Sequence, residues 1–259
     1  MSDKETSNAC CPATCCASPA ETHLQNCMVC GGQLLYQSHA EEKTCNYCGA
    51  LSATSVFCPD GHYVCEACHG AGYYAFLQQY ALNTSSRDPM SIAEALLQSP
   101  ALPSLGGEHH PLVAAALLGA LKNHGEFLLP DGTRRCITDA DILEGMRRMK
   151  QIPSCSCAYH GACGAGLAVG TTFSLLLGAT CANDMERTLA MRATNAALAA
   201  IADCGGPACC KQSVRTAILS GVGLLKELFR IHLPLSRSRC FHQKDTSHGC
   251  KGMACRFSR

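Results

Sequence analysis

From residue 72 onward, hydrophobic residues recur at the three- and four-residue spacing of amphipathic helices. The segments with this pattern are 72–82, 92–99, 112–123, 139–151, 161–183, 187–202 and 214–229. No alternating run of β-branched residues longer than a few positions follows residue 70. The pattern therefore predicts a mostly α protein with a helical domain as its larger part.

Several residues before these segments have the chemistry of helix starts. Ser91 and Ser213 are expected to cap two of them, and Thr138 with Asp141 resembles a capping box before a third. Pro111 is expected at the first helical position of its segment, where its missing N–H costs nothing.

The uncharged segment 161–183 is long enough to span a bilayer, which takes about 20 residues. Glycines, several threonines and two cysteines dilute its apolar content, and no basic cluster flanks it. A buried helix that lets its neighbours approach closely is the favoured interpretation.

The chain divides by composition into three parts. Residues 1–24 show no pattern that could bury a face, and we expect a disordered tail there. This tail contains Cys10, Cys11, Cys15 and Cys16. Residues 25–82 are expected to form a small metal-binding module, and residues 83–259 an α-helical, cysteine-rich domain.

The cysteine content changes the picture from a plain helical protein to a metalloprotein. The 259 residues include 22 cysteines, and the N-terminus has neither the basic nor the apolar region of a secretory signal. We therefore expect a cytoplasmic protein whose thiols bind metal rather than form disulfides. A net charge of +1 favours neither nucleic acid nor a membrane surface as a partner.

Two Cys-x-x-Cys-Gly knuckles, 27–31 and 45–49, precede a third ligand-rich segment, 58–68. Two residues between thiolates let both sulfurs reach one tetrahedral ion, and glycine permits the tight turn that follows. The eight candidate ligands are Cys27, Cys30, Cys45, Cys48, Cys58, His62, Cys65 and Cys68.

Eight ligands suffice for two four-ligand ions. The ligands could bind in chain order, or interleave, with Cys27, Cys30, Cys58 and His62 on one ion and Cys45, Cys48, Cys65 and Cys68 on the other. Interleaving is preferred because segment 58–68 is short for a complete cage. Four protein ligands leave no open position, so structural zinc is expected at both sites, with rubredoxin-type iron as the alternative.

A second group of cysteines lies in glycine-bearing turns at predicted helix starts, where free N–H groups stabilise thiolates and anionic clusters. Thiolates from separated segments suit an iron–sulfur cluster, of 4Fe-4S type here, better than zinc. The candidate cluster ligands are Cys157, Cys163, Cys209, Cys240, Cys250 and Cys255.

Titratable residues beside these turns are candidates for catalysis. Glu108, His109 and His110 precede a predicted helix and could supply a general base, although they could equally serve only as helix-start residues. Successive side chains diverge, so we expect one of Cys209 and Cys210 to remain off the cluster. We assign that role to Cys210, with Lys211 lowering its pKa.

The ordered motifs CPDGHYVCEACH, GEHHPLVAAALLGALKN, CAYHGACGAGLAVG, GGPACCKQSVRTAI and the closing C-x9-C-x4-C resemble a cysteine-rich family, domain of unknown function 5714, over about residues 27–258. The resemblance implies an origin in anaerobic bacteria or archaea and a methyltransferase or redox partner. It names no reaction.

The segment GACGAGLAVGTTFSLLLGAT and the turn that follows the next helix are similar to the α-chain of iron–sulfur serine dehydratases and to cysteine desulfidases. That similarity implies a cluster on Cys163, Cys204 and either Cys209 or Cys210. The chain lacks that family's acidic residue after the first cysteine and its Cys-Asp-Pro turn.

These features predict an iron–sulfur-dependent lyase or sulfur-transfer enzyme with structural zinc, acting on a small anionic or sulfur-containing substrate. Two alternatives remain open at this point. One is a non-catalytic module that binds metal, sulfur or a partner, and the other is an electron carrier.

Overall fold

The computed structural model describes residues 27–65, 68, 72–102, 105–129, 131–241 and 249–258. The predicted tail, with Cys10, Cys11, Cys15 and Cys16, lies outside the described residues, so its disorder stays a prediction.

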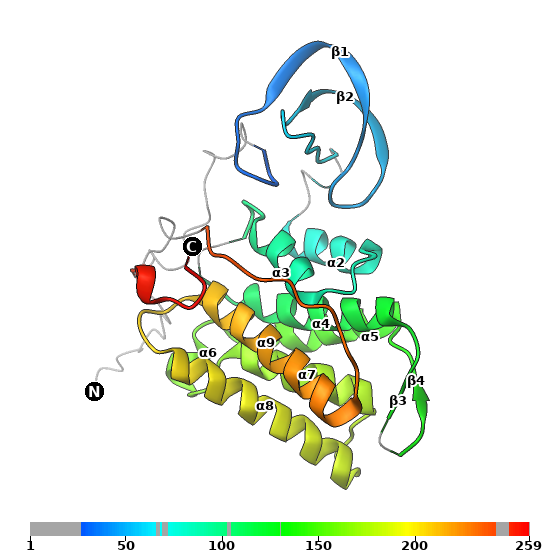
Figure 1. Ribbon diagram of the computed structural model, residues 1–259, viewed down its shortest axis with the longest axis vertical. Coiled ribbons are helices and arrows are strands. Elements are labelled where there is room, and N and C mark those ends of the chain that lie inside the picture. Colours follow the sequence, from blue (N-terminus) through cyan, green and yellow to red (C-terminus); the bar gives the residue numbers. More distant parts are fainter. Residues whose placement is uncertain are drawn as a thin grey trace, which may run out of the picture.

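The fold is mostly helical, as predicted, with a small β-hairpin module at the N-terminal end (Figure 1). The helices are α2 (Tyr73–Asn83), α3 (Pro89–Leu97), α4 (His109–His124), α5 (Asp139–Lys150), α6 (Ser156–Tyr159), α7 (Gly164–Leu177), α8 (Asp184–Cys204) and α9 (Cys210–Phe229). A short ribbon of β3 (Phe127–Leu128) and β4 (Arg134–Arg135) joins α4 to α5, and a 3₁₀ turn, η2 (Gly252–Ala254), lies near the C-terminus.

The N-terminal module is an antiparallel pair, β1 (Leu35–Thr44) and β2 (Leu51–Phe57), with the second knuckle at the turn between the strands. Both knuckles close with a hydrogen bond from a glycine N–H to the first cysteine carbonyl, 2.7 Å at Gly31 and 2.9 Å at Gly49. These two glycines have φ of 74° and 73°, a conformation that favours glycine. The knuckle spacing therefore folds as the sequence pattern indicates.

The helical domain is built around α4, which is buried on every face from His109 to Leu121. Helices α2, α3, α5, α7 and α9 all contact it. A helix that is hydrophobic all round can be stable only inside other elements. Its placement fixes where the N-termini of its neighbours meet.

The predicted helix start is confirmed for α5, where a full capping box is present. The predicted starts of α3, α4 and α9 differ from those in the structure. Thr138 and Asp141 form the predicted capping box of α5. Helix α3 instead begins at Pro89 and is capped by Asp88, whose Oδ1 accepts the N–H groups of Met90 and Ser91 at 2.9 and 3.1 Å. Ser91 is thus inside the helix, because an Asp-Pro start is available three residues earlier.

Two other helices also begin earlier than expected. Helix α9 begins at Cys210 and is capped by Cys209, whose sulfur accepts the N–H of Gln212 at 3.4 Å. Ser213 lies in the first turn, and its hydroxyl donates to the Cys209 carbonyl at 3.3 Å. Pro111 is the third residue of α4 rather than the first, and it still interrupts no intrahelical bond there.

The uncharged segment forms α7, which is largely buried against α4, α8 and α9. Gly166 permits the close approach of α8, because a Cβ there would lie 2.6 Å from Leu198 Cδ2. Within the described residues, no helix has the length and apolar character needed to cross a membrane.

The module and the helical domain are joined by Tyr47 of the second knuckle. Its ring packs on Phe76 of α2, with ring centroids 3.8 Å apart. Its hydroxyl donates to the Met28 carbonyl in the first knuckle at 2.7 Å. One side chain therefore links both knuckles to the helical core.

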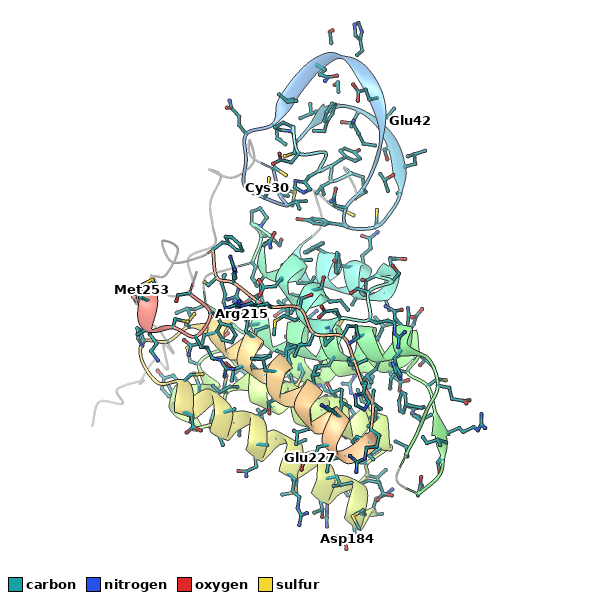
Figure 2. All side chains as sticks on the ribbon, in the orientation of Figure 1. Cys30, Glu42, Asp184, Arg215, Glu227 and Met253 are labelled. Carbon is teal, nitrogen blue, oxygen red and sulfur yellow. The ribbon has the colours of Figure 1, made fainter. Side chains whose placement is uncertain are left out.

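After α9 the chain runs back past α3, as Figure 1 shows. Arg215 of α9, labelled in Figure 2, is 1% exposed and donates two hydrogen bonds to Glu94 of α3, at 2.6 and 2.9 Å. Ser238 of the returning segment also donates to Glu94, and the Ser236 N–H donates to Asp88 at 2.7 Å. These hydrogen bonds hold the segment that carries Cys240 against α3 and α9.

Replacing Glu94 by Ala should lower the free energy of unfolding by about 3–5 kcal/mol, because it leaves the Arg215 guanidinium buried without its carboxylate. Urea denaturation measures this loss. The double replacement Glu94→Met with Arg215→Met should cost less than the single one, because it buries no charge.

Glu126→Ala is the matched control, since its ion pair with Arg134 is exposed and should contribute at most about 1 kcal/mol. Equal losses for Glu94→Ala and Glu126→Ala would contradict the importance of the buried pair.

Candidate metal centres and cysteine site

The first metal-binding group, tetrad 1, consists of Cys27, Cys30, Cys58 and His62, one ligand atom of each lying within 4.8 Å of the others. The Cys30 and Cys58 sulfurs are 3.5 Å apart. His62 Nδ1 is buried and has no hydrogen-bond partner among the described residues. Such a nitrogen in a thiol-rich group suits metal ligation.

The second group, tetrad 2, consists of Cys45, Cys48, Cys65 and Cys68, with the same 4.8 Å limit between ligand atoms. Burial raises the pKa of Cys45, but backbone N–H groups of Cys65, Cys48 and Tyr47 outweigh it and lower the value to about 7. Burial raises the pKa of Cys48 and of Cys68, and the neighbouring cysteines add to the rise at Cys68.

Three or four thiols so close together cannot all ionise unless a cation lies among them, because each thiolate disfavours the next. Each tetrad could therefore hold one metal ion, and its four protein ligands would leave no open position. The grouping is the interleaved one, with each knuckle completed by two ligands from segment 58–68.

The two tetrads differ in their surroundings. Cys45, Cys65 and Cys68 belong to the same hydrophobic cluster as the helical domain, whereas Cys30 of tetrad 1 is exposed and does not belong to it. Tetrad 2 is thus part of the contact between module and core.

The candidate residues of the helical domain gather where three helices begin. Cys210 is the first residue of α9, and Cys163 is the N-cap of α7. The ring of His110, the second residue of α4, lies on Gly164, the first residue of α7. A Cβ on Gly164 would lie 2.5 Å from His110 Nδ1, so only glycine fits.

Cys210 lies among other thiols. Burial raises its pKa to about 12, and the Cys163, Cys157 and Cys209 sulfurs add to that rise. The backbone N–H of Gly106 hydrogen-bonds to the Cys210 sulfur and acts in the opposite direction. As in the tetrads, these thiols would need a cation beside them to ionise together.

Cys209 has a different set of charged neighbours, which includes Cys240 of the returning segment. Burial raises the pKa of Cys209 and the Cys240 sulfur adds to it, while the charges of Arg215 and Lys211 lower it in part. The adjacent sulfurs of Cys209 and Cys210 therefore have different neighbours, as expected from the divergence of successive side chains.

The remaining predicted cluster ligands lie nearer the edge of this region. The Cys255 sulfur is 4.0 Å from Gln212 Oε1, and the Cys240 N–H donates to the Phe257 carbonyl at 2.6 Å. Cys250 is exposed, and its sulfur accepts the N–H of Gly252 at 3.3 Å within its own turn. Cys204 lies beside Thr216, with sulfur and hydroxyl 3.4 Å apart.

Among the described residues, only the two tetrads bring three or more ligand atoms as close as one shared ion requires. The spacing required by one shared ion does not apply to an iron–sulfur cluster. There each cysteine binds a different iron, and the cysteine sulfurs are further apart.

The predicted acid–base residues border the same region. Glu108 is the N-cap of α4, and its carboxylate lies over Gly106. His109 Nδ1 is 3.2 Å from the Gly106 carbonyl, to which it donates. Burial lowers the pKa of His110, and Lys211 is buried at the start of α9.

Three residues that contribute to this part of the structure were not predicted from the sequence. Gly106 and Gly164 act through backbone contacts, which leave no chemical signature in a sequence. Glu94 had a weak signal, since it is the single charged residue in the apolar run IAEALL.

A sequence profile described as a family of unknown function, DUF5714, matches residues 77–258. No curated protein and no solved structure matches the chain. The match covers more than half of the chain, including all of the helical cysteine region and none of tetrad 1 or tetrad 2.

Replacing Cys48 by Ser should reduce the bound metal from two ions per chain to one, because tetrad 2 loses a ligand while tetrad 1 is intact. Elemental analysis of the purified protein measures this. Circular dichroism should still show the helical domain. Cys136→Ser is the control, since Cys136 is exposed and outside both tetrads, and an equal loss of metal there would contradict the assignment.

Gly164→Ala should lower the free energy of unfolding by about 1–3 kcal/mol, because the new methyl group would overlap the His110 ring. Thermal unfolding with denaturant titration measures the change. Gly223→Ala in α9 is the matched control: nothing lies within 4 Å of its Cβ position, so alanine should stabilise that helix by up to about 1 kcal/mol. A stabilised Gly164→Ala protein would contradict the close contact.

Proposed function

The chain belongs to DUF5714, and we propose that it is an iron–sulfur-dependent lyase or sulfur-transfer enzyme whose cluster lies at the meeting point of α4, α7 and α9, with structural zinc in the two N-terminal tetrads. The observation that carries the proposal is the grouping of the Cys157, Cys163 and Cys210 thiols from two separate segments beside candidate acid–base residues.

Zinc is the proposed metal of the tetrads because three or four thiolates, with a histidine in one site, are its usual structural ligands. Closed coordination suits a structural role, since a substrate would find no open position. Tetrad 2 would then support the contact that Tyr47 makes with α2.

An iron–sulfur cluster is the proposed group of the helical site because its ligands are thiols and come from distant segments. Three thiols of a four-iron cluster would leave one iron for a substrate, as Lewis-acid chemistry requires. When bound, the cluster would polarise a hydroxyl, thiol or carbonyl group of the substrate.

The sequence predicts Cys209 as a cluster ligand and Cys210 as the thiol off the cluster. The neighbours of these two thiols in the structure support the opposite assignment. Cys210 shares its surroundings with Cys157 and Cys163, so we propose it as the third ligand. Cys209 is near enough to Cys240, Arg215 and Lys211 for their charges to act on it, and we propose it as the thiol that remains off the cluster. The positive charges of Arg215 and Lys211 offset part of the rise in its pKa that burial causes.

Glu108 and His109, at the start of α4, are the proposed carriers of protons in the reaction. The proposed substrate is small and anionic or contains sulfur, because helix N-termini and Lys211 favour negative charge there. The proposed setting is the cytoplasm of an anaerobe, with a methyltransferase or redox protein as a partner.

The test is anaerobic purification followed by iron, sulfide and zinc analysis and visible absorption spectroscopy. Cys210→Ala and Cys163→Ala should each lose most of the iron, because each removes one of three proposed ligands. Cys209→Ala should keep the iron and the cluster spectrum but lose turnover. Cys181→Ala, at an exposed position outside the site, is the control and should change neither.

Two results would overturn this function. Full iron content in both the Cys209→Ala and Cys210→Ala proteins would remove the cysteine site as the cluster site. A cluster with four cysteine ligands and reversible one-electron redox, unaffected by substrate candidates, would instead indicate an electron carrier or a binding module.

A further inference from the structure

His110 has an unused hydrogen-bonding atom in the interior. The residue is 6% exposed, and its Nδ1 is buried without a hydrogen-bond partner among the described residues. Buried polar atoms in folded proteins are nearly always hydrogen-bonded, so an unpartnered one needs a physical reason. A ligand group that binds there would supply the missing partner.

The hydrogen-bonding role of His110 Nδ1 follows from the partner of the other ring nitrogen, Nε2. The imidazole hydrogen-bonds to the backbone of Ile152. A carbonyl oxygen can only accept, and Nδ1 has no partner, so Nε2 carries the proton that is donated. In the neutral ring Nδ1 is then a bare lone pair, which accepts a hydrogen bond and cannot donate one. Its natural partner is an O–H, S–H or N–H group.

The position of Nδ1 connects it with the cysteine site. Nδ1 lies against Gly164, next to Cys163, at the start of α7. Helices α4, α7 and α9 all begin in this region, and their free N–H groups and dipoles favour a negative charge. Lys211, buried at the start of α9, adds a positive charge.

The negative group of a ligand would lie on the α9 side of His110. Glu108 lies on the α4 side and would repel an anion there. A ligand that spans the region therefore needs a donor at one end and an anion at the other.

We propose that this region binds a small carboxylic acid bearing a hydroxyl or thiol group on the carbon next to the carboxylate, with that group donating its hydrogen bond to His110 Nδ1 and the carboxylate lying at the starts of α7 and α9. The inference rests on the proposed function for what happens to the ligand afterwards. The binding itself does not require a reaction.

Three acids that differ in one group test the donor. Lactate has a hydroxyl, 2-mercaptopropionate has a thiol in the same place, and propionate has only hydrogen. Titration calorimetry with the full chain, purified anaerobically, should show lactate or 2-mercaptopropionate binding about tenfold more tightly than propionate, the effect of one hydrogen bond to a buried acceptor.

Two substitutions separate the two ring nitrogens. His110→Gln places an amide N–H near the position of Nε2, so the bond to Ile152 can be kept while the Nδ1 acceptor is lost. The preference over propionate should then fall to about one. His110→Asn places an amide oxygen near Nδ1 and gives up the bond to Ile152, and it should keep a measurable preference.

The inference is overturned if the wild-type protein binds the three acids equally or not at all, or if His110→Gln keeps the tenfold preference. Iron and sulfide contents of the same samples keep this result separate from the proposed function. A preference that depends on His110 in protein without iron would support the binding site and overturn the cluster. A normal iron content without any preference over propionate would support the cluster and overturn the binding site.

Discussion

The burial of α4 on every face from His109 to Leu121 is the constraint on which the rest of the helical domain depends. An apolar helix without a polar face has to be covered on all sides, and α2, α3, α5, α7 and α9 provide the cover. Their packing directions bring the starts of α7 and α9 to the start of α4. The cysteine site is a consequence of that arrangement, because Cys163 and Cys210 are terminal residues of the two neighbouring helices.

A second constraint acts on the thiols. Taking several cysteines out of water raises their pKa values, as at Cys68 and Cys210, and keeps them protonated unless a cation lies among them. The same physics therefore applies to tetrad 2 and to the site at α9. The difference is spacing, since the tetrads have the close packing of ligands around one ion and the helical site does not.

The returning C-terminal segment shows how one buried ion pair can serve a distant site. Arg215 and Glu94 join α9 to α3, and Ser238 joins the segment to the same carboxylate. Cys240 is two residues further on and thereby comes to lie beside Cys209. A buried ion pair gives little net stability against an apolar substitute, but its directional hydrogen bonds fix a geometry.

Local features of this protein were determined by the sequence alone. The knuckle spacing at Cys45 and Cys48, the capping box at Thr138 and the helical periodicity all act within a few residues, so they can be recognised without the fold. Only the tertiary structure decided that His110 rests on Gly164, and that the Cys210 thiol is near enough to Cys163 for the two charges to interact. These contacts join residues about 50 apart along the chain, and they follow from the packing of whole helices around α4, which no local pattern of side chains encodes.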